Sequence, residues 1–219
     1  WIWSAGGDYL NQANTASVLM TSEFMAGFSF YMGLVNRGFV DRASLLKNTI
    51  GVEQDFHQGK YALIVDGPNE LQGIASRVDI APYPKGPGGD ATFIGGSNLA
   101  IFENAKHKEE AWEVIKYLMT DKAQIAYSKA SWFMPAVVSA LNDPYITNDS
   151  RRLVLKEAIK NGRTYPTTAF WGNIETRLTR RLNGMWDDVS SKPLNTFDIQ
   201  GFIELADEEV QRILRQYKQ

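Results

Sequence analysis

Residues 95–119 of the chain read GGSNLAIFENAKHKEEAWEVIKYLM, and this stretch decides the class of fold. Residues 98–102, NLAIF, are entered through a Gly-Gly-Ser turn and are mostly apolar, which is typical of a short buried strand. Beyond a polar connection, apolar residues at 111, 114, 115 and 118 recur at helical spacing and predict a helix from about 108 to 119. A buried strand followed by an amphipathic helix indicates an α/β fold.

Two further short strands are predicted upstream of this stretch. Residues 61–65, YALIV, are too short for a globular helix and lie between glycine-containing turns, so they predict a buried strand. Residues 78–81, VDIA, predict a second strand. It leads into residues 82–89, PYPKGPGG, whose prolines and glycines predict a loop. Residues 78–119 are therefore predicted to form a strand, a loop, a second strand and a helix, in this order.

Helices are predicted for most of the remaining chain. Thr21 or Ser22 is expected to cap a helix that ends at Gly38, and Asp121 is expected to cap one that continues to residue 130. Apolar periodicity predicts two more helices, over about 153–161 and 171–182. The last helix has the clearest apolar stripe, formed by Phe202, Ile203, Ala206, Val210, Ile213, Leu214 and Tyr217.

Charge and composition exclude several classes of function. The 219 residues include 23 Lys+Arg and 25 Asp+Glu, and no basic run exceeds two residues, so nucleic acid is not an expected partner. No apolar run approaches the roughly 20 residues that a membrane-spanning helix needs. There is no cysteine, which excludes disulfides, thiolate nucleophiles and cysteine zinc sites. No metal and no other cofactor is expected.

The sequence contains none of the common catalytic signatures, such as a phosphate-binding glycine loop, a nucleophile elbow or an HExxH segment. His57 and His107 lie in polar surroundings and are interpreted as surface residues. Paired carboxylates leave one catalytic alternative open, because glycoside hydrolysis needs only two acids at a defined separation. Asp66 with Glu70, and the acids at 187–188, are the candidate pairs for such a glycoside hydrolase.

The six tryptophans fall into two groups. Trp112 and Trp186 belong to helical stripes and are interpreted as core residues. The other four lie on loops or at helix starts: Trp1, Trp3, Trp132 and Trp171. An indole in such a place either packs on the protein or stacks on the apolar face of a ligand, and a sugar ring offers such a face.

Seven phrases follow one another along the chain. They are Gly6-Gly7; Phe30-Tyr31 with Leu34 and Gly38; Phe56 with Gly59-Lys60-Tyr61-Ala62-Leu63 and Gly67-Pro68; the loop 82–89; Gly95-Gly96-Ser97-Asn98-Leu99-Ala100-Ile101; Ala111-Trp112 with Ile115, Leu118, Gln124, Tyr127 and Met134-Pro135-Ala136; and Gly162-Arg163 with Pro166, Trp171 and Ile174. In this order the phrases resemble the extracellular solute-binding proteins of ABC importers, in the sugar-binding branch that includes the maltose-binding proteins. The resemblance covers essentially the whole chain.

The resemblance implies an α/β, periplasmic-binding-protein-like fold of two lobes with a ligand cleft between them. It implies that Trp171 stacks on a sugar and that the turn 95–97 lines the cleft. The full set of ligand-binding residues that it implies is Trp3, Gly6, Asn69, Glu70, Gly95, Gly96, Ser97, Trp132, Phe133 and Trp171. No catalytic residue is expected.

One position in this set departs from the family pattern. The family usually has a tryptophan after the Gly67-Pro68 pair, whereas this chain has Asn69 and Glu70. Asn69 both donates and accepts hydrogen bonds and an ionised Glu70 only accepts them, so the pair suits hydroxyl-rich or cationic ligands and disfavours anionic ones.

By the resemblance, residues 1–73 and 121–219 belong to a helix-rich second (C-terminal) lobe, and residues 74–120 form a crossover unit that completes the first lobe. Family members are nearly twice as long, so an amino-terminal lobe is expected to be missing and the start at Trp1 to be a truncation. A lipid anchor on the missing N-terminus is one option for tethering the protein to the cell surface.

The expected function is the capture of a neutral sugar or oligosaccharide in the periplasm or outside the cell. Stacking and hydrogen bonds would hold the ligand, and the closed protein would deliver it to the transmembrane permease subunits of an ABC importer. Besides a glycoside hydrolase, a second alternative is an isolated lobe that binds nothing by itself.

Overall fold

The computed structural model describes residues 1–74, 76–191 and 197–217, and the chain divides into two compact units. The first unit comprises Trp1–Val52, Pro84–Ala91 and Thr164–Gln219, and the second comprises Glu53–Tyr83 and Thr92–Arg163. The chain therefore passes from one unit to the other four times. Each unit has a hydrophobic core of its own.

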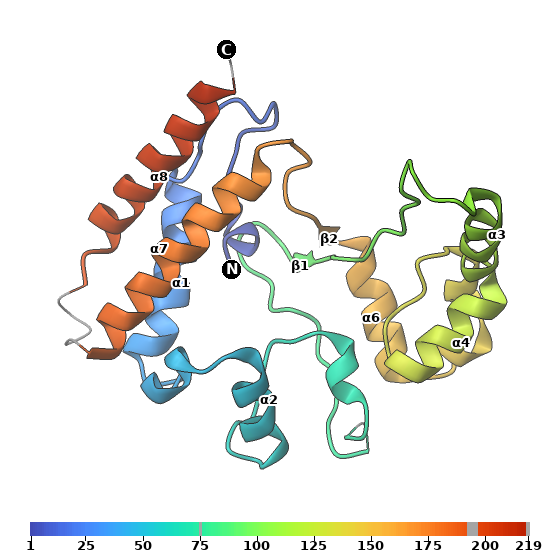
Figure 1. Ribbon diagram of the computed structural model, residues 1–219. Helices are drawn as coiled ribbons and strands as arrows, with labels where there is room; N and C mark the ends of the chain where they lie inside the picture. Colours follow the sequence, from blue (N-terminus) through green and yellow to red (C-terminus); the bar gives the residue numbers. More distant parts are fainter. Residues whose placement is uncertain (75, 192–196, 218–219) are drawn as a thin grey trace. The chain divides into compact units, whose positions relative to one another are not determined.

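Three long helices build the first unit: α1 (Ser22–Asn36), α7 (Trp171–Ser191) and α8 (Ile199–Gln216), of which α8 contacts both of the others (Figure 1). Two short 3-10 helices accompany them, η1 (Trp3–Ala5) and η2 (Arg42–Leu46). The apolar faces of the long helices form the core, with Phe24, Phe28, Met32, Val35, Ile174, Met185, Val189, Ile203, Ala206, Val210 and Leu214 buried. The predicted stripe of the last helix is therefore confirmed, although Tyr217 at its end is half exposed.

The ends of α1 follow the sequence signals. The Thr21 hydroxyl accepts a hydrogen bond from the Phe24 amide and caps the first turn, and Gly38 follows the helix in a left-handed conformation with φ of +74°. By contrast, α7 continues nine residues beyond the predicted end at 182, to Ser191. Trp186 consequently lies within α7 and packs against the core, as predicted.

Two glycines of the loop 82–89 allow it to lie directly against η1. The Gly88 amide donates a hydrogen bond to the Ser4 carbonyl oxygen at 2.8 Å. A Cβ atom added to Gly88 would come within 2.3 Å of the Gly6 nitrogen, and one added to Gly86 would come within 2.3 Å of the Ser4 oxygen. Only glycine fits this backbone contact at either position.

Helices α3 (Lys108–Leu118), α4 (Asp121–Ser131), α5 (Pro144–Thr147) and α6 (Ser150–Lys160) build most of the second unit (Figure 1). The 3-10 helices η3 (Pro68–Leu71) and η4 (Ser139–Asn142) belong to it as well. Strand β1 (Thr92–Phe93) pairs in parallel with β2 (Gly162–Arg163). The core is small and contains Ile125, Ala140 and Ile146. A further helix, α2 (Thr49–His57), begins in the first unit and ends in the second.

The three predicted buried strands do not form in this chain, so that prediction was wrong. Residues 61–65, 78–81 and 98–102 have no strand assignment, and Leu63 and Phe102 are 72% and 84% exposed. A strand requires a neighbour to pair its backbone groups. Within the described residues the only sheet is the two-residue β1–β2 pair, and none of these segments pairs with it.

Three further predictions need correction. Trp112 is 50% exposed rather than part of the core, and no other residue of its helix α3 is buried either. Thr120, not Asp121, caps α4, since the Thr120 hydroxyl accepts the Ala123 amide. Helix α2 was not predicted at all. None of the described helices has the length and apolar character needed to cross a membrane.

Candidate ligand-binding site

A cavity of about 410 Å³ opens in the first unit between the segment before α7 and the first turn of that helix. Its walls combine aromatic, hydroxyl and carboxylate side chains. The residues that line it are Tyr165, Pro166, Thr167, Thr168, Ala169, Trp171, Gly172 and Glu175. Trp171, which the sequence singled out, is therefore part of a cavity.

Trp171 forms the base of this cavity rather than its exposed surface. The indole is only 8% exposed, and Tyr9 contacts it edge-on with ring centroids 5.9 Å apart. The ring of Tyr165 lies parallel to Trp171, at 3° and 6.0 Å, and this tyrosine is 48% exposed. Tyr165 is therefore the aromatic side chain most accessible to a ligand. The sequence reasoning missed it, although an aromatic directly before Pro166 was an available signal.

Two buried polar atoms in this cavity make no hydrogen bond with the described residues. They are the Trp171 indole nitrogen and the Thr168 hydroxyl oxygen. A buried polar group left unsatisfied costs about 1–3 kcal/mol, and both atoms are enclosed by protein. The groups that the cavity offers to a ligand are the Tyr165 ring and the exposed Thr167 and Glu175 side chains.

Trp3 and Gly6 belong to the same unit and lie in or next to η1. The Trp3 indole nitrogen donates to the Asp8 carboxylate at 3.2 Å. Gly6 adopts φ of +93°, which favours glycine, and ends η1. The loop 82–89 lies directly against the Gly6 backbone, and the part of Trp3 and Gly6 in ligand binding stays a prediction.

Asn69 and Glu70 lie on η3 in the second unit. The Asn69 amide donates to one Glu70 oxygen at 2.9 Å, and the His57 Nε2 atom lies 3.7 Å from the other. Burial and the neighbouring carboxylates Glu53 and Asp66 raise the pKa of Glu70, while His57 acts in the opposite direction. Asn69 and Glu70 are thus held in place by their hydrogen bond to each other and by His57, and the carboxylates around them make the site negatively charged.

Trp132 and Phe133 follow the end of α4. Trp132 caps this helix with φ of +64°, an uncommon conformation for a residue with a side chain. The Arg152 guanidinium carbon lies 4.0 Å from the centroid of the Trp132 ring. Phe133 is 42% exposed and stacks on Tyr127 at 6.4 Å. Both rings are therefore held by other side chains and remain accessible in part.

The turn 95–97 is exposed along its whole length. A Cβ atom on Gly96 would meet nothing within 4 Å, and one on Gly95 would come closest to the ring of Phe93, at 2.8 Å. Within the described residues, no backbone approaches this turn closely enough to explain Gly96. The role of residues 95–97 in a ligand cleft stays a prediction.

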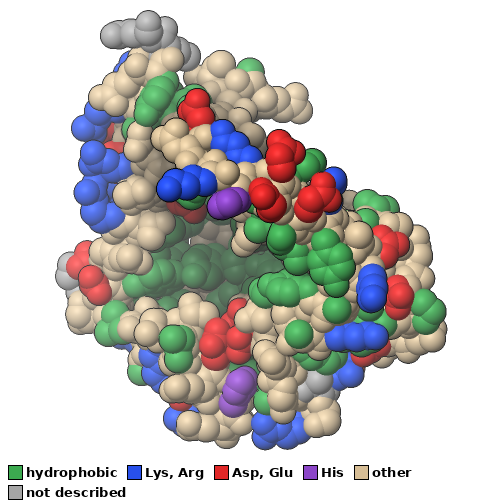
Figure 2. Space-filling model, turned by 45° about the vertical axis from the view of Figure 1, so that its right-hand side comes forward, with side chains coloured by type: hydrophobic (Ala, Val, Ile, Leu, Met, Phe, Trp, Pro, Cys, Tyr) green, Lys and Arg blue, Asp and Glu red, His purple; other side chains and the backbone are tan. Residues whose placement is uncertain are grey.

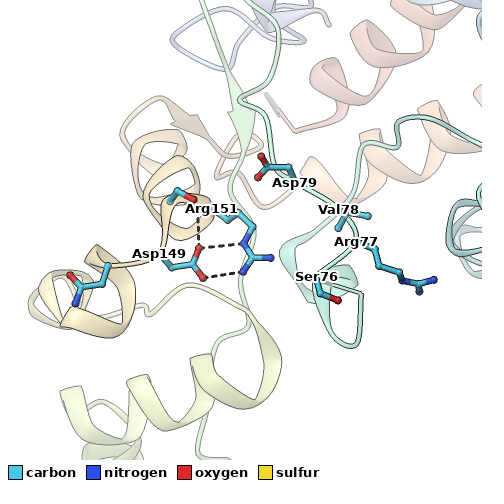
Figure 3. A pocket seen from close by; sticks show the side chains of 8 residues that line it. Ser76, Arg77, Val78, Asp79, Asp149 and Arg151 are labelled. Atoms are coloured by element: carbon cyan, nitrogen blue, oxygen red, sulfur yellow. Dashed lines mark hydrogen bonds and ion pairs between the residues drawn. The ribbon is translucent and has the colours of Figure 1, made fainter.

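A second cavity, of about 660 Å³, lies within the second unit and was not predicted. Residues 76–79 form one side, and residues 148–151, at the start of α6, lie opposite (Figure 3). The Asp149 carboxylate accepts the Arg151 amide at 2.9 Å and the Arg151 guanidinium at 3.3 and 3.4 Å. Partial burial acts to raise the pKa of Asp149, but these hydrogen bonds outweigh it and lower the pKa. Arg77 points away from the pair (Figure 3).

One of the two acid pairs considered for a hydrolase, at 187–188, gains no support from the structure, whereas Asp66 lies close enough to Glu70 to help raise its pKa. Residues 187–188 are adjacent on α7, and adjacent positions of a helix do not face each other. In the described part of the chain, no three His, Cys, Asp or Glu side chains gather in a way that could hold a metal ion.

Comparison with known proteins assigns the family. The family model of the bacterial extracellular solute-binding proteins matches residues 1–125, which is more than half of the chain. The chain therefore belongs to this family, whose members are solute-binding proteins rather than enzymes.

Individual relatives are distant but extend over most of the chain. A binding protein of Brucella abortus is 24% identical over 191 residues, covering 84% of this chain and 46% of that protein. The maltotriose-binding protein of Pyrococcus abyssi is 23% identical over 218 residues, covering 94% of this chain and 45% of that protein. The chain thus spans about half the length of the curated relatives that it matches.

A solved structure with the same fold is that of the sugar-binding protein MalE from Xanthomonas citri. It superimposes with a TM-score of 0.77 at 20% identity, and the match covers 99% of this chain and 55% of that one. The prediction of a periplasmic-binding-protein-like fold from seven weak phrases is therefore confirmed.

Proposed function

We propose that this chain is part of the carbohydrate-binding component of an ABC importer, and that it binds a neutral sugar or oligosaccharide. The cavity at residues 165–175 is the observation that carries this proposal. Its stacked Tyr165 and Trp171 rings offer an apolar surface, and the exposed Thr167 and Glu175 side chains beside them offer hydrogen-bonding groups. Sugars combine an apolar ring face with hydroxyl groups that both donate and accept, so they match this arrangement.

The relatives support the same class of ligand. One is a maltotriose-binding protein and another is a sugar-binding protein, and both share the fold or the sequence pattern over nearly the whole chain. We also propose ligand contacts for the remaining predicted residues, which are Trp3, Gly6, Asn69, Glu70, Gly95, Gly96, Ser97, Trp132 and Phe133. The absence of a catalytic signature and the solute-binding family argue against the glycoside hydrolase alternative.

The lobe boundaries form a separate part of the proposal. We assign residues 1–73 and 121–219 to the second lobe of the longer protein, and 74–120 to the crossover unit. The rest of the longer protein would then supply neighbours for residues 61–65 and 98–102 and cover the exposed side of α3, where Trp112 and Tyr117 are 50% and 57% exposed. Hydrophobic side chains are also visible in groups on the face drawn in Figure 2.

Delivery completes the proposed function. The full-length protein would act outside the cytoplasmic membrane, either free or tethered by a lipid anchor, and the ligand-bound form would dock on the permease subunits of the importer. Closure of two lobes around a ligand by hinge motion is the general mechanism that makes such recognition dependent on the ligand.

A fluorescence titration tests the proposal. Maltotriose added to the full-length protein is expected to change tryptophan emission in a saturable way, because Trp171 lines the cavity. A charged control sugar, such as a uronic acid, should cause no saturable change. Saturation by the uronic acid together with no response to any neutral oligosaccharide would contradict the proposed class of ligand.

A further inference from the structure

The second unit contains a buried arginine, Arg152, whose positive charge is not close-paired with a carboxylate. Arg152 is only 1% exposed, although a charged side chain is almost never fully buried without strong pairing. Its ion-pair partner is the Asp149 carboxylate, whose nearer oxygen is 4.0 Å from the Arg152 Nε atom. The Nε atom itself makes no hydrogen bond with the described residues.

Two aromatic rings hold this guanidinium instead. Its central carbon lies 4.0 Å from the centroid of the Trp132 ring and 4.0 Å from that of the Tyr145 ring. The guanidinium also donates to the Tyr145 hydroxyl and to the Ser128 hydroxyl, the latter at 3.4 Å. Cation–π attraction is strongest where water is excluded, which is the situation here.

The contact with Arg152 orients the side chain of a tryptophan that lies just beyond the end of a helix. Trp132 adopts φ of +64° at the end of α4, and its amide bonds to the Ser128 carbonyl. Ser128 also accepts a hydrogen bond from Arg152, so the helix end and the indole are tied to the same guanidinium. Rotation of the indole away from this position would break the ring contact with Arg152.

Stability alone does not require an arginine at this position. Replacing a buried charge by an apolar side chain of similar volume is often neutral or stabilising, because the cost of removing the charge from water is avoided. A methionine would fill the same space between the two rings but would not set their orientation, since it is flexible and carries no charge. The arginine therefore contributes a fixed orientation of the two rings rather than stability.

We infer that Arg152 is a positioning residue that holds the Trp132 indole in the orientation in which it contacts the sugar. The inference rests on the proposed function, since it takes Trp132 as a ligand-binding residue. Arg152 itself lies beneath the indole and does not touch the ligand.

The test uses the full-length protein labelled with 5-fluorotryptophan. The ¹⁹F resonance of Trp132 is assigned by its loss in Trp132→Ala. In Arg152→Met that resonance is expected to shift and broaden while those of the other tryptophans stay in place, and Arg152→Lys, which keeps the charge, should restore part of the original shift. An unchanged Trp132 resonance in Arg152→Met would overturn the inference.

Maltotriose affinity provides the second measurement. Arg152→Met is expected to weaken binding about tenfold in the protein that has Trp132, and less than twofold in the Trp132→Ala background. An equal loss in both backgrounds would overturn the inference, because Arg152 would then act on the fold and not through the indole. Unimpaired binding by Trp132→Ala would overturn it as well.

The two levels of the proposal can fail separately. If the unmodified protein binds no neutral oligosaccharide, the proposed function is refuted, and with it the role of Trp132 in binding. A second outcome is that the protein binds maltotriose and Trp132→Ala weakens this binding, but Arg152→Met changes neither the affinity nor the Trp132 resonance. In that case only the positioning role of Arg152 is refuted.

Discussion

Tyr165 and Trp171 have different roles in the same cavity, because one is half exposed and the other is buried. The sequence pointed to Trp171 as the ring that stacks on a sugar. In the structure Trp171 supports Tyr165 from beneath and also packs on Tyr9. A substitution of Trp171 therefore changes the core and the cavity together, whereas a substitution of Tyr165 changes mainly the cavity.

This difference predicts distinct results for two alanine variants. Tyr165→Ala should weaken maltotriose binding at least tenfold and change the free energy of unfolding by less than about 1 kcal/mol, as is usual for an exposed side chain. Trp171→Ala should lower the free energy of unfolding by about 3–5 kcal/mol, as a large-to-small core substitution does. Calorimetric binding and urea unfolding measure the two effects.

Tyr165→Phe is the matched control, since it keeps the ring and removes only the hydroxyl. Its affinity should stay within about threefold of that of the unmodified protein. Normal binding by Tyr165→Ala would show that this ring is not part of the site.

Glu70 gives a prediction about pH. Burial and the acids Glu53 and Asp66 raise its pKa above the ordinary value of 4.5, so the folded state holds this proton more tightly than the unfolded state. The resulting stability is fully present below the ordinary pKa and is lost as pH rises through the raised one. Glu70→Gln resembles the protonated form and keeps an oxygen that can accept the Asn69 amide.

The melting temperature of Glu70→Gln should therefore equal that of the unmodified protein near the acid end of this window, exceed it increasingly as pH rises from the ordinary to the raised pKa, and exceed it by a constant amount above the raised pKa. Thermal denaturation between about pH 4 and pH 7 measures the difference. Glu204→Gln, at an exposed position of α8, controls for the loss of one surface charge. A lower melting temperature for Glu70→Gln at pH 7 would contradict the prediction.

At the level of elements, the glycines of the loop 82–89 hold it against η1. Gly88→Ala would place a Cβ atom 2.3 Å from the Gly6 nitrogen. Because both contacting groups are backbone, one of the two segments would have to move to relieve this clash. We expect this variant to lower the free energy of unfolding by about 1–3 kcal/mol, the usual cost of forcing an extra methyl group into a packed contact.

Gly184→Ala is the matched control, with an expected effect of opposite sign. Gly184 lies within α7, and an added Cβ atom would meet nothing within 4 Å. Alanine in a helix interior is favoured over glycine by about 0.5–1 kcal/mol, so this variant should be more stable. Chemical denaturation of both variants measures the pair, and equal effects would refute the docking of the loop.

Most of the helices, though not α2, could be predicted from the sequence and the strands could not, for a physical reason. The caps and apolar periods of α1, α6 and α8 are local, so residues 22–36, 150–160 and 199–216 carry the information for their own structure. A strand depends on a partner that is distant in sequence. The run 61–65 has the composition of a buried strand, but no described segment pairs with it.

The candidate site was predictable to a similar degree. Trp171 and Trp132 were singled out because tryptophans on loops and helix starts are conspicuous in a sequence, and their contact with a ligand stays a prediction. Tyr165 and Arg152 were missed, since their importance arises from contacts with these rings in space: a parallel ring at 6.0 Å and a guanidinium at 4.0 Å. No spacing along the chain indicates either contact.

For the whole molecule, the exposed apolar side chains give a prediction about the remainder of the protein. Leu63, Val65, Leu99 and Phe102 are 57% to 84% exposed in this chain, which spans about half the length of its relatives. Exposed apolar groups of this kind mark surfaces that contact something else. The 219-residue chain alone should bind the dye 1-anilinonaphthalene-8-sulfonate several-fold more strongly than the full-length protein, as fluorescence at equal molar concentration would measure. Equal dye binding would contradict the proposed lobe assignment.

The central claim is that this chain contributes a sugar-binding surface to a solute-binding protein of an importer. Isothermal titration of the full-length protein with maltotriose and a panel of other neutral oligosaccharides tests it most directly. We predict one saturable site per molecule for at least one of these sugars, loss of that binding in Tyr165→Ala, and no sugar turnover. The absence of saturable binding to every neutral sugar in the panel, or hydrolysis of any of them, would contradict the account.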